Sequence, residues 1–461
     1  MTSVVVGLGK TGASCLRYLA KRGIAATATD SRRAPPGLAD IGHLARTLDI
    51  RLGGFDLSLL DGASQLLMSP GVSLDEPIAR AARARGIEVL GDVELFARAV
   101  HAPVIGVTGT NGKSTVTSLV ASMATAAGRR VLAGGNLGEP ALDLLDQPIP
   151  DLYVLELSSF QLETTSSLDL AAAVVLNITA DHRDRYATME EYARAKSRIF
   201  MRAATVVLNA DDPWVAAMGM PGNQGAALRG GAARKTLTFS TQRADADYSL
   251  LRNGERTFLA RHGEAVLDTE RMKIKGLHNA ANALAALALG DAVGLPLAAM
   301  LDALETFPGL PHRSAWVADI AGVRYVDDSK GTNVGATIAA VAGMPGPLVL
   351  IAGGEGKGQD FAPLAAALHA KVRHAVLIGR DAPALERTLS AVCTTSRAAS
   401  MEAAVAAAAQ AAQPGDTVLL SPACASLDMF RDYGHRGDVF AAAVRALAEQ
   451  ALAEQASGRR S

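Results

Sequence analysis

The feature that most constrains this fold is a strand, a glycine-rich loop and a helix in succession, a pattern that occurs three times. We expect the strands at 4–6, 104–107 and 348–352, and the loops that follow them read GLGKTG, TGTNGKST and GGEGKGQDF. Short β-branched runs alternate with Ala- and Leu-rich helical stretches through most of the chain, which is typical of βαβ units and parallel sheets. Because ligands bind at the carboxyl ends of strands in such sheets, each loop marks a candidate site.

The length of the chain, 461 residues, exceeds what one hydrophobic core normally supports. We predict three α/β domains: an N-terminal Rossmann-like domain at 1–93, a central P-loop-type ATPase domain at 94–308 and a C-terminal Rossmann-like domain at 309–461. Glycine and proline interrupt the pattern near both boundaries, at 91–103 and 307–311. We expect the tail from about 441 to be a helix that frays at its end.

The charge of the chain is balanced, with 45 Lys and Arg against 46 Asp and Glu and a formal net charge of −1. This balance gives no general field for nucleic acid or a membrane surface. The three cysteines, Cys15, Cys393 and Cys424, are far apart, which argues against a disulfide framework and fits a reducing compartment. With no charged leader and no apolar run of spanning length, we expect a cytoplasmic protein that acts as a monomer on small-molecule substrates.

The first glycine loop has the dinucleotide-binding spacing. Gly7, Gly9 and Gly12 follow a strand and open a helix, and the acid Asp30 ends the next strand. Lys10 and Thr11 add a cation and a hydroxyl that suit a phosphate. We favour a nucleotide diphosphate at the helix N-terminus, with no specific indication of nicotinamide. The alternative is a tight turn without a ligand.

The second loop, GVTGTNGKST at 106–115, departs from the usual phosphate-loop spacing. The Walker pattern needs its first glycine at position 107, where this chain has Val107. A lysine at a helix start, flexible glycines and a Ser/Thr hydroxyl for Mg²⁺ are nevertheless what ATP phosphates require, and Lys113, Ser114 and Thr115 supply them. We predict an ATP site of a lineage other than the common NTPases. A purely structural turn is the alternative.

Three further side chains stand out downstream of this loop. Glu156 and His182 follow apolar strands, whose ends should share a rim with the phosphate loop, so the two could hold one metal ion; ordinary loop residues are the alternative. Lys196 shares a helical face with Tyr192, Ile199 and Phe200. A lysine there must reach solvent, pair or lose its charge, and reaching solvent is the default interpretation.

Several segments of the chain resemble those of a known enzyme family. The segments GVTGTNGKST, ELSSFQLE at 156–163, LNITADHRDRY at 176–186, YARAKSRIF at 192–200 and HNAANALAA at 278–286 resemble the Mur ligases. These ATP-dependent enzymes add amino acids to a UDP-muramyl precursor in peptidoglycan and cell-wall synthesis. The resemblance is narrowed to the branch that adds D-glutamate to UDP-N-acetylmuramoyl-L-alanine by four further segments: PHR at 311–313, DDSKGTN at 327–333, GGEGKGQDF at 353–361 and SPACASLDMF at 421–430. The motifs occur in order over essentially the whole chain.

The resemblance implies four groups of site residues. The UDP-substrate group is Gly9, Lys10, Thr11, Asp30, Ser31, Arg32, Gly71, Asn136, Ser158 and Gln161. The ATP group is Gly109, Thr110, Asn111, Gly112, Lys113, Ser114, Thr115, Asn279, Asn282, Arg313 and Asp328. The metal group, for two Mg²⁺ ions, is Ser114, Thr115, Glu156, His182 and a carbamylated Lys196. The glutamate group is Lys330, Thr332, Lys357, Ser426, Leu427 and Tyr433.

The implied reaction is amide ligation through an acyl phosphate and a tetrahedral intermediate, with Lys113, Lys196, His182 and Lys330 as catalytic residues and ADP and phosphate as products. Neutralising the charge on the phosphoryl group falls to Lys113 and Mg²⁺. We also expect the C-terminal domain to close over the site. The chain departs from the family at RDYGHRG, 431–437, where Tyr433 replaces a usual Phe and Gly434 a usual Glu. This departure leaves the configuration and identity of the amino acid open.

Three other functions compete with this interpretation. A folylpolyglutamate synthetase would share the central loop and the lysine, but such enzymes begin with the ATP domain and lack GLGKTG. An NAD-dependent oxidoreductase would explain GLGKTG and leave 109–115 idle. A nucleotide-binding switch would use 109–115 and leave about three hundred downstream residues unexplained.

Overall fold

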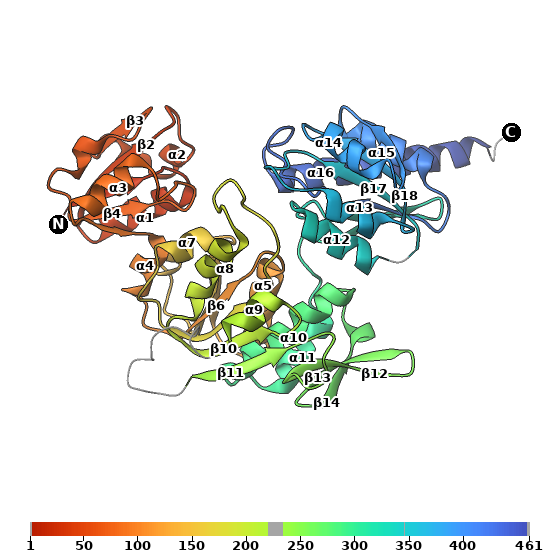
Figure 1. The fold of residues 1–461 in the computed structure, drawn as a ribbon, viewed down its shortest axis with the longest axis horizontal. Helices are drawn as coiled ribbons and strands as arrows, with labels where there is room; N and C mark the ends of the chain where they lie inside the picture. The colour runs from red at the N-terminus through yellow and green to blue at the C-terminus, as the bar shows by residue number, and fades with distance from the viewer. Residues whose placement is uncertain (1, 220–233, 345, 459–461) are drawn as a thin grey trace. The chain divides into compact units, whose positions relative to one another are not determined.

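The computed structural model describes residues 2–219, 234–344 and 346–458, and it contains three separate sheets with helices packed against them (Figure 1). Each sheet is wholly or mainly parallel, so the predicted class of three α/β domains is confirmed. The strands expected at 4–6, 104–107 and 348–352 are present as β1, β6 and β17.

The N-terminal sheet has five parallel strands in the order β3-β2-β1-β4-β5. Its central strand, β1, ends in three valines, and Val4, Val5 and Val6 are fully buried. The strands are β1 (Thr2–Val6), β2 (Ala25–Asp30), β3 (Asp49–Leu52), β4 (Gln65–Met68) and β5 (Glu88–Leu90), and the helices are α1 (Lys10–Lys21), α2 (Gly37–Asp40), η1 (Gly42–Arg46), η2 (Leu57–Leu60), α3 (Pro77–Ala84) and α4 (Asp92–Ala97).

The central sheet has the order β14-β13-β12-β11-β10-β9-β6-β8-β7, parallel from β7 to β12 and closed by the antiparallel strands β13 and β14. The strands are β6 (Val104–Thr108), β7 (Val131–Gly135), β8 (Leu152–Glu156), β9 (Leu170–Val175), β10 (Ala203–Asn209), β11 (Lys235–Phe239), β12 (Tyr248–Asn253), β13 (Arg256–Arg261) and β14 (Glu264–Asp268). The helices are α5 (Lys113–Ala126), α6 (Ala141–Leu144), α7 (Ser159–Glu163), α8 (Met189–Ser197), η3 (Arg198–Phe200), α9 (Pro213–Met218), η4 (Thr269–Arg271), α10 (Leu277–Ala292) and α11 (Leu297–Thr306).

The C-terminal sheet has the order β15-β16-β20-β17-β18-β19, with only β15 antiparallel to its neighbour. Alternate residues of β17 enter two cores: Leu348 and Leu350 belong to the first, and Val349 and Ile351 belong to the second. The strands are β15 (Ala315–Ile320), β16 (Val323–Asp327), β17 (Leu348–Gly353), β18 (Val372–Ile378), β19 (Thr394–Arg397) and β20 (Thr417–Leu420), and the helices are α12 (Val334–Gly343), α13 (Ala362–Leu368), α14 (Ala382–Leu389), α15 (Met401–Ala411) and α16 (Tyr433–Gly458).

By its internal contacts the chain divides into two compact units. The first holds residues 1–178, 190–272 and 281–307, and the second holds 179–189, 273–280 and 308–461. The N-terminal and central sheets therefore belong to one unit and the C-terminal sheet to the other. The two predicted domain boundaries stay predictions.

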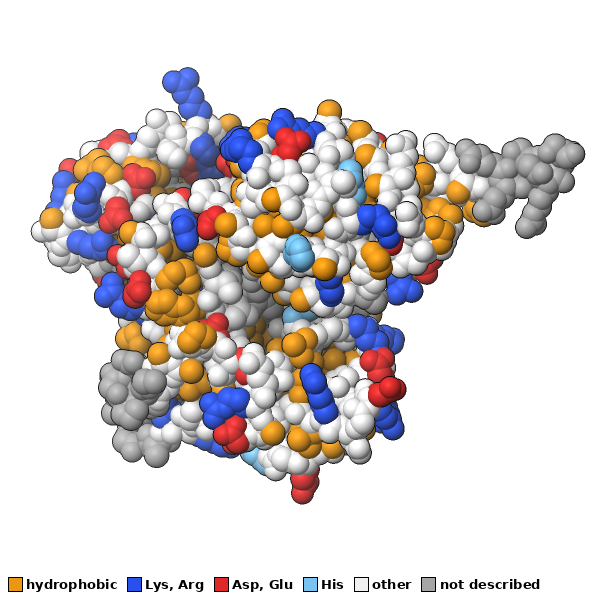
Figure 2. Space-filling model, turned by 45° about the vertical axis from the view of Figure 1, so that its right-hand side comes forward, with side chains coloured by type: hydrophobic (Ala, Val, Ile, Leu, Met, Phe, Trp, Pro, Cys, Tyr) orange, Lys and Arg blue, Asp and Glu red, His pale blue; other side chains and the backbone are white. Residues whose placement is uncertain are grey.

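The surface and the tail agree with the expectations from composition. Basic and acidic side chains are interspersed on the face shown in Figure 2 rather than gathered into a field of one sign. No helix in the part of the chain that the structure describes is both long and apolar enough to cross a bilayer. The tail is helical as predicted, but its helix, α16, begins earlier, at Tyr433.

Candidate active site

The phosphate loop joins β6 to α5 at the carboxyl end of the parallel strands. Its last glycine, Gly112, has φ +84°, and a Cβ at this position would lie 2.4 Å from Oδ1 of Asn282, so only glycine fits. The ammonium of Lys113 donates to the carbonyl oxygens of Gly109, at 3.0 Å, and Thr110, at 2.8 Å. The 14-residue helix α5 begins at Lys113, and the positive end of its dipole at this point favours an anion.

Asn177, which follows β9, fixes the shape of this loop. Its side-chain oxygen accepts from the N–H of Asn111 at 2.8 Å, and its amide donates to the Asn111 carbonyl at 3.1 Å. Its own carbonyl accepts from the N–H of Thr110 at 2.9 Å. Three hydrogen bonds from one residue therefore hold the loop before any nucleotide binds.

Glu156, the last residue of β8, connects the phosphate loop to a second region. Its side chain is 2 % exposed. Oε2 accepts from the hydroxyl of Ser114 at 2.6 Å, and Oε1 accepts from Nδ2 of Asn136 at 2.6 Å. One carboxylate thus contacts the start of α5 and the loop after β7. Hydroxyl and carboxylate oxygens are the ligands that Mg²⁺ takes from proteins.

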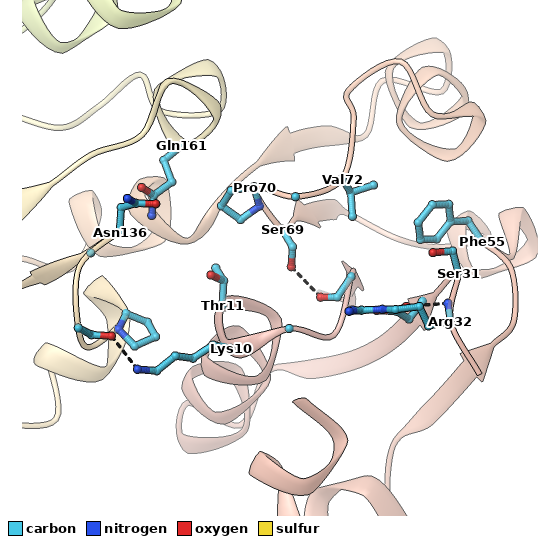
Figure 3. A pocket seen from close by; sticks show the side chains of 17 residues that line it. Lys10, Thr11, Ser31, Arg32, Phe55, Ser69, Pro70, Val72, Asn136 and Gln161 are labelled. Carbon is cyan, nitrogen blue, oxygen red and sulfur yellow. Dashed lines mark hydrogen bonds and ion pairs between the residues drawn. The ribbon is translucent and has the colours of Figure 1, made fainter. Parts of the chain in front are cut away.

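An open cavity of about 560 Å³ lies where the first glycine loop faces the loop after β7 (Figure 3). At Gly12 a Cβ would lie 1.9 Å from the Gly7 carbonyl oxygen, which explains the third glycine of GLGKTG; at Gly9 a Cβ would meet nothing within 4 Å. Nζ of Lys10 donates to the Gly138 carbonyl at 2.6 Å, across the cavity mouth. The lining includes Gly9, Lys10, Thr11, Asp30, Ser31, Arg32, Gly71, Asn136 and Gln161.

Asp30 organises one end of this cavity. Its carboxylate accepts from the N–H of Leu8 at 2.6 Å and from the backbone and guanidinium of Arg32 at 2.8–2.9 Å. Burial alone would raise the pKa of Asp30, but the hydrogen bonds from Arg32 and Leu8 outweigh burial and lower it. Asp30 therefore stays a carboxylate that stabilises the glycine loop and holds Arg32 at the cavity.

Lys196 does not reach solvent, so the default interpretation from the sequence is wrong. The side chain is 2 % exposed, and its ammonium lies over the Tyr192 ring, 4.7 Å from the centroid. The hydroxyl of Thr110 in the phosphate loop donates to the Tyr192 hydroxyl at 3.3 Å. The helix face carrying Lys196 is thus in direct contact with the nucleotide loop.

In the second unit three loops meet at the carboxyl ends of β16, β17 and β20. The N–H of Ala423 donates to the Gly331 carbonyl at 2.8 Å, and Glu355 and Ala425 exchange two hydrogen bonds of 2.9 Å. These contacts join the loops at 327–333, 353–361 and 421–430. Together they carry all of the residues predicted for glutamate except Tyr433, which begins α16.

A buried arginine stabilises two of these loops. Arg436 is fully buried and donates to the hydroxyl of Ser329 at 2.9 Å, to its carbonyl at 2.7 Å and to the Cys424 carbonyl at 3.1 Å. Burial lowers the pKa of Arg436 to about 10, which still leaves it charged at neutral pH. The ammonium of Lys330 lies 3.5 Å from the centroid of the Tyr433 ring. Arg436 thus joins the loops at 327–333 and 421–430.

Beside this cluster lie the acids of DDSK. Asp327 pairs with His312, with Nδ1 and Oδ2 2.7 Å apart. Asp328 accepts from Ser421 Oγ at 2.8 Å and from the N–H of Ser314 at 3.1 Å. Burial raises the pKa of Asp328 to about 7.

Family models match three successive segments of the chain: the MurD-like N-terminal domain of Mur ligases at 1–91, the Mur ligase middle domain at 107–290 and the Mur ligase glutamate ligase domain at 312–424. A UDP-N-acetylmuramoylalanine–D-glutamate ligase from Nitrosococcus oceani is 55% identical over 447 residues, which are 96% of each chain. The chain belongs to the Mur ligase family.

A second relative and a solved structure agree with this family. A UDP-N-acetylmuramoylalanine–D-glutamate ligase from Methylococcus capsulatus is 51% identical over 446 residues, 96% of this chain and 95% of the relative. The solved structure of the UDP-N-acetylmuramate-alanine ligase MurC from Thermotoga maritima covers 97% of this chain and 99% of its own, with a TM-score of 0.60 and 18% identity. At that identity it shows the Mur ligase fold alone. The family that the chain matches over most of its length is therefore a ligase family, and not a family of oxidoreductases or nucleotide-binding switch proteins.

The residues that the Mur ligase resemblance implied fall into several groups in the structure. All of the UDP-substrate residues except Ser158 line the one cavity, and Ser158 instead caps α7, accepting from the N–H of Gln161 at 3.2 Å. Asn282 lies against Gly112, whereas the amide of Asn279 donates to the Lys275 carbonyl at 2.9 Å. His182 belongs to the other compact unit than Glu156, so a metal site shared by the two stays a prediction.

Sequence reasoning missed several residues that shape this Mur ligase site. Asn177 and Arg436 each make three hydrogen bonds to predicted site loops, and neither was assigned a role. Asn177 lies inside LNITADHRDRY, a segment that carried the resemblance, whereas Arg436 lies inside RDYGHRG, where the chain departs from the family. The available signal was a polar side chain next to a buried strand or on an apolar helix face, where a partner is required.

Proposed function

We propose that this chain catalyses the ATP-dependent addition of D-glutamate to UDP-N-acetylmuramoyl-L-alanine, a step of peptidoglycan synthesis, with release of ADP and phosphate. The observation that carries the proposal is Glu156, whose carboxylate hydrogen-bonds both Ser114 of the phosphate loop and Asn136 of the cavity wall. A ligase must bring a nucleotide phosphate to a substrate carboxylate, and this arrangement supports two adjacent sites. The names of the relatives that are more than 50% identical support the choice of substrates.

The cavity suits a nucleoside diphosphate sugar by its position and chemistry. The N-terminus of α1 opens at Gly9 and Lys10, where backbone N–H groups and a cation favour a diphosphate. Ser31 and Arg32 lie on one side of this point, and Asn136 and Gln161 lie on the other (Figure 3). We assign the first side to uridine and the second to the sugar, which directs the muramyl carboxylate toward the central domain.

In the first chemical step the γ-phosphoryl group of ATP passes to that carboxylate and forms an acyl phosphate. Lys113, folded over the loop in this structure, would turn to the phosphates and neutralise charge in the transition state. The amine of glutamate then attacks the acyl carbon, and phosphate leaves the tetrahedral intermediate. The adenine part of ATP is assigned to Asn279, Asn282, Arg313 and Asp328.

The residues present fit Mg²⁺. Ser114 Oγ and Glu156 Oε2 are hard oxygen donors 2.6 Å apart at the phosphate loop. When bound, Mg²⁺ would stabilise the negative charge that develops on the transferred group. Thr115, His182 and a carbamylated Lys196 complete the proposed ligands of two ions.

The three joined loops of the C-terminal domain form the proposed glutamate site, with Lys330, Thr332, Lys357, Ser426, Leu427 and Tyr433. Cations at Lys330 and Lys357 suit an amino acid that carries two carboxylates. In this chain the ring of Tyr433 contacts Lys330, so the replacement of Phe by Tyr keeps a cation–π partner for that lysine. On this basis we expect the unusual Tyr433-Gly434 pair to preserve the choice of D-glutamate.

The test is phosphate release by the purified protein with ATP, Mg²⁺ and UDP-N-acetylmuramoyl-L-alanine, offered D-glutamate, L-glutamate or other amino acids separately. Release that requires both the UDP-substrate and D-glutamate supports the proposal. Release with L-glutamate alone would correct the configuration, and release with neither, despite intact ATP binding, would refute the ligase function.

A further inference from the structure

Asp92 lies at the junction between the N-terminal and central sheets, in the segment that connects β5 to β6. It is the first residue of α4, is 2 % exposed and follows Gly91. A Cβ at Gly91 would lie 2.4 Å from the hydroxyl oxygen of Thr164, so the start of α4 is pressed against the residue that ends α7. The position of Asp92 relative to α7 is therefore closely defined.

The side chain that Asp92 contacts on α7 is Gln161. Nε2 of Gln161 donates to Oδ2 of Asp92 at 3.4 Å, and Oε1 of Gln161 accepts from the N–H of Ser158 at 3.1 Å. A backbone N–H can only donate and a carboxylate can only accept, so the two partners determine which end of the amide is which. Gln161 is held with its oxygen toward the backbone and its NH₂ group toward Asp92.

This orientation bears on the cavity, because Gln161 is one of its lining residues. Figure 3 shows Gln161 beside Asn136, on the side opposite Arg32 and Phe55. The NH₂ group carries two hydrogens, and Asp92 accepts one of them. The second is available to a ligand in the cavity, whereas Oε1 is already engaged by Ser158.

We propose that Asp92 is a positioning residue for the substrate site: it orients the Gln161 amide so that Gln161 donates a hydrogen bond to an acceptor oxygen at the sugar end of the UDP-substrate. The inference rests on the proposed function for the identity of that substrate. Asp92 acts through Gln161 and does not line the cavity itself. Without the carboxylate, the amide loses the partner that holds its NH₂ group.

A purely structural role is the competing explanation, because an acid in the first turn of a helix favours the helix N-terminus. Glu94 separates the two roles. It lies on the same helix, is also 2 % exposed and accepts from the N–H groups of Ser166, at 2.7 Å, and Ser167, at 3.0 Å. Glu94→Gln therefore perturbs a buried carboxylate of α4 that does not contact Gln161.

The experiment compares Asp92→Ala, Asp92→Asn and Glu94→Gln in the full chain. We expect Asp92→Ala to raise the KM for UDP-N-acetylmuramoyl-L-alanine about tenfold, with kcat and the KM for ATP within about twofold, because the lost contact serves binding of one substrate. Asp92→Asn keeps an acceptor oxygen for Gln161 and should restore the KM to within about threefold. Glu94→Gln should leave it unchanged.

Calorimetric binding provides a readout without turnover. Asp92→Ala should weaken the binding of UDP-N-acetylmuramoyl-L-alanine about tenfold and leave the binding of UDP alone unaffected, because Gln161 lies at the sugar end of the proposed site. In Asp92→Ala/Gln161→Ala the loss should not exceed that in Gln161→Ala, since both changes remove the same contact. Equal weakening of UDP and of the full substrate would overturn the inference.

The outcomes separate this inference from the proposed function. If the wild type releases no phosphate with both substrates present, the ligase assignment fails. If the wild type is active and Asp92→Ala keeps its KM and binding, the positioning role fails. Should Asp92→Ala not fold, Gln161→Glu is the deciding variant, because it retains Asp92 but its carboxylate cannot donate a hydrogen bond to the UDP-substrate. A KM for the UDP-substrate within about twofold of wild type would refute the hydrogen bond from Gln161, and a rise of about tenfold or more would support that hydrogen bond.

Discussion

Replacing Asp92 with asparagine should stabilise the protein, and the gain should depend on pH. Burial raises the pKa of Asp92 to about 6 from an ordinary value of 3.8, and the hydrogen bonds from Gln161 and the backbone offset burial only in part. Oδ1 of Asp92 is buried without a hydrogen-bond partner in the structure. The ionised carboxylate is therefore the less favourable form in the folded state.

The sign and size of the effect follow from these two pKa values. Because the folded-state pKa lies above the unfolded one, the contribution of Asp92 is most favourable below 3.8 and is lost as the pH rises through about 6. The full penalty is about 3 kcal/mol, from roughly two pKa units at about 1.4 kcal/mol each. The Asp92→Asn variant, whose amide resembles the protonated acid, should be more stable than wild type by roughly 2 kcal/mol at about pH 5 and by about 3 kcal/mol at about pH 7.5.

Amide hydrogen exchange of α4 and α7, corrected for intrinsic rates, measures this difference locally, which matters because a chain of 461 residues does not unfold in two states. The difference between wild type and Asp92→Asn cancels the other titrating groups. Asp30 and Glu94, whose pKa values are lowered, stabilise the folded state at neutral pH and lose this contribution as the pH falls, which is the opposite pH dependence. A difference that stays constant between about pH 5 and about pH 7.5 would refute the reasoning.

Three further predictions concern the site. Glu156→Gln should reduce kcat/KM about a hundredfold, because an amide cannot accept from both of the donors that Glu156 now serves; steady-state kinetics with unchanged kcat/KM would contradict this. Lys196→Ala should abolish ligation and leave binding of the UDP-substrate intact by calorimetry, and near-normal turnover would exclude the carbamate role. Gly12→Ala should destabilise the N-terminal domain in thermal melts, whereas Gly9→Ala should fold normally and bind UDP more weakly, since only Gly12 lies against backbone. Equal melting temperatures for the two variants would argue against this packing.

Sequence spacing was sufficient for features that depend on local geometry. GLGKTG and TGTNGKST each follow a buried strand and open a helix, because glycine at these points permits close backbone approach and a sharp turn. The strand and helix pattern also predicted three α/β domains. Such features involve residues within one βα unit, where the order along the chain determines the neighbours in space.

Contacts between distant segments could not be predicted in the same way. Asn136 follows β7 and Glu156 ends the neighbouring strand β8, but their hydrogen bond depends on the register of the two strands, which sequence does not show. Lys196 illustrates a different limit. Helical periodicity placed it correctly on the face of Tyr192, but periodicity describes direction and not depth, so the burial of its ammonium was unforeseen.

We expect the shared carboxylate of Glu156 to link the two halves of the proposed site thermodynamically. A ligand that takes an oxygen of Glu156 at the phosphate loop changes the strength of its hydrogen bond to Asn136, and a substrate that takes Asn136 changes the charge available at Ser114. Linkage is reciprocal, so each ligand alters the affinity of the other by the same factor. The factor by which nucleotide changes the affinity for the UDP-substrate should therefore equal the factor by which the UDP-substrate changes the affinity for nucleotide. We expect Glu156 to be the residue that couples the two sites.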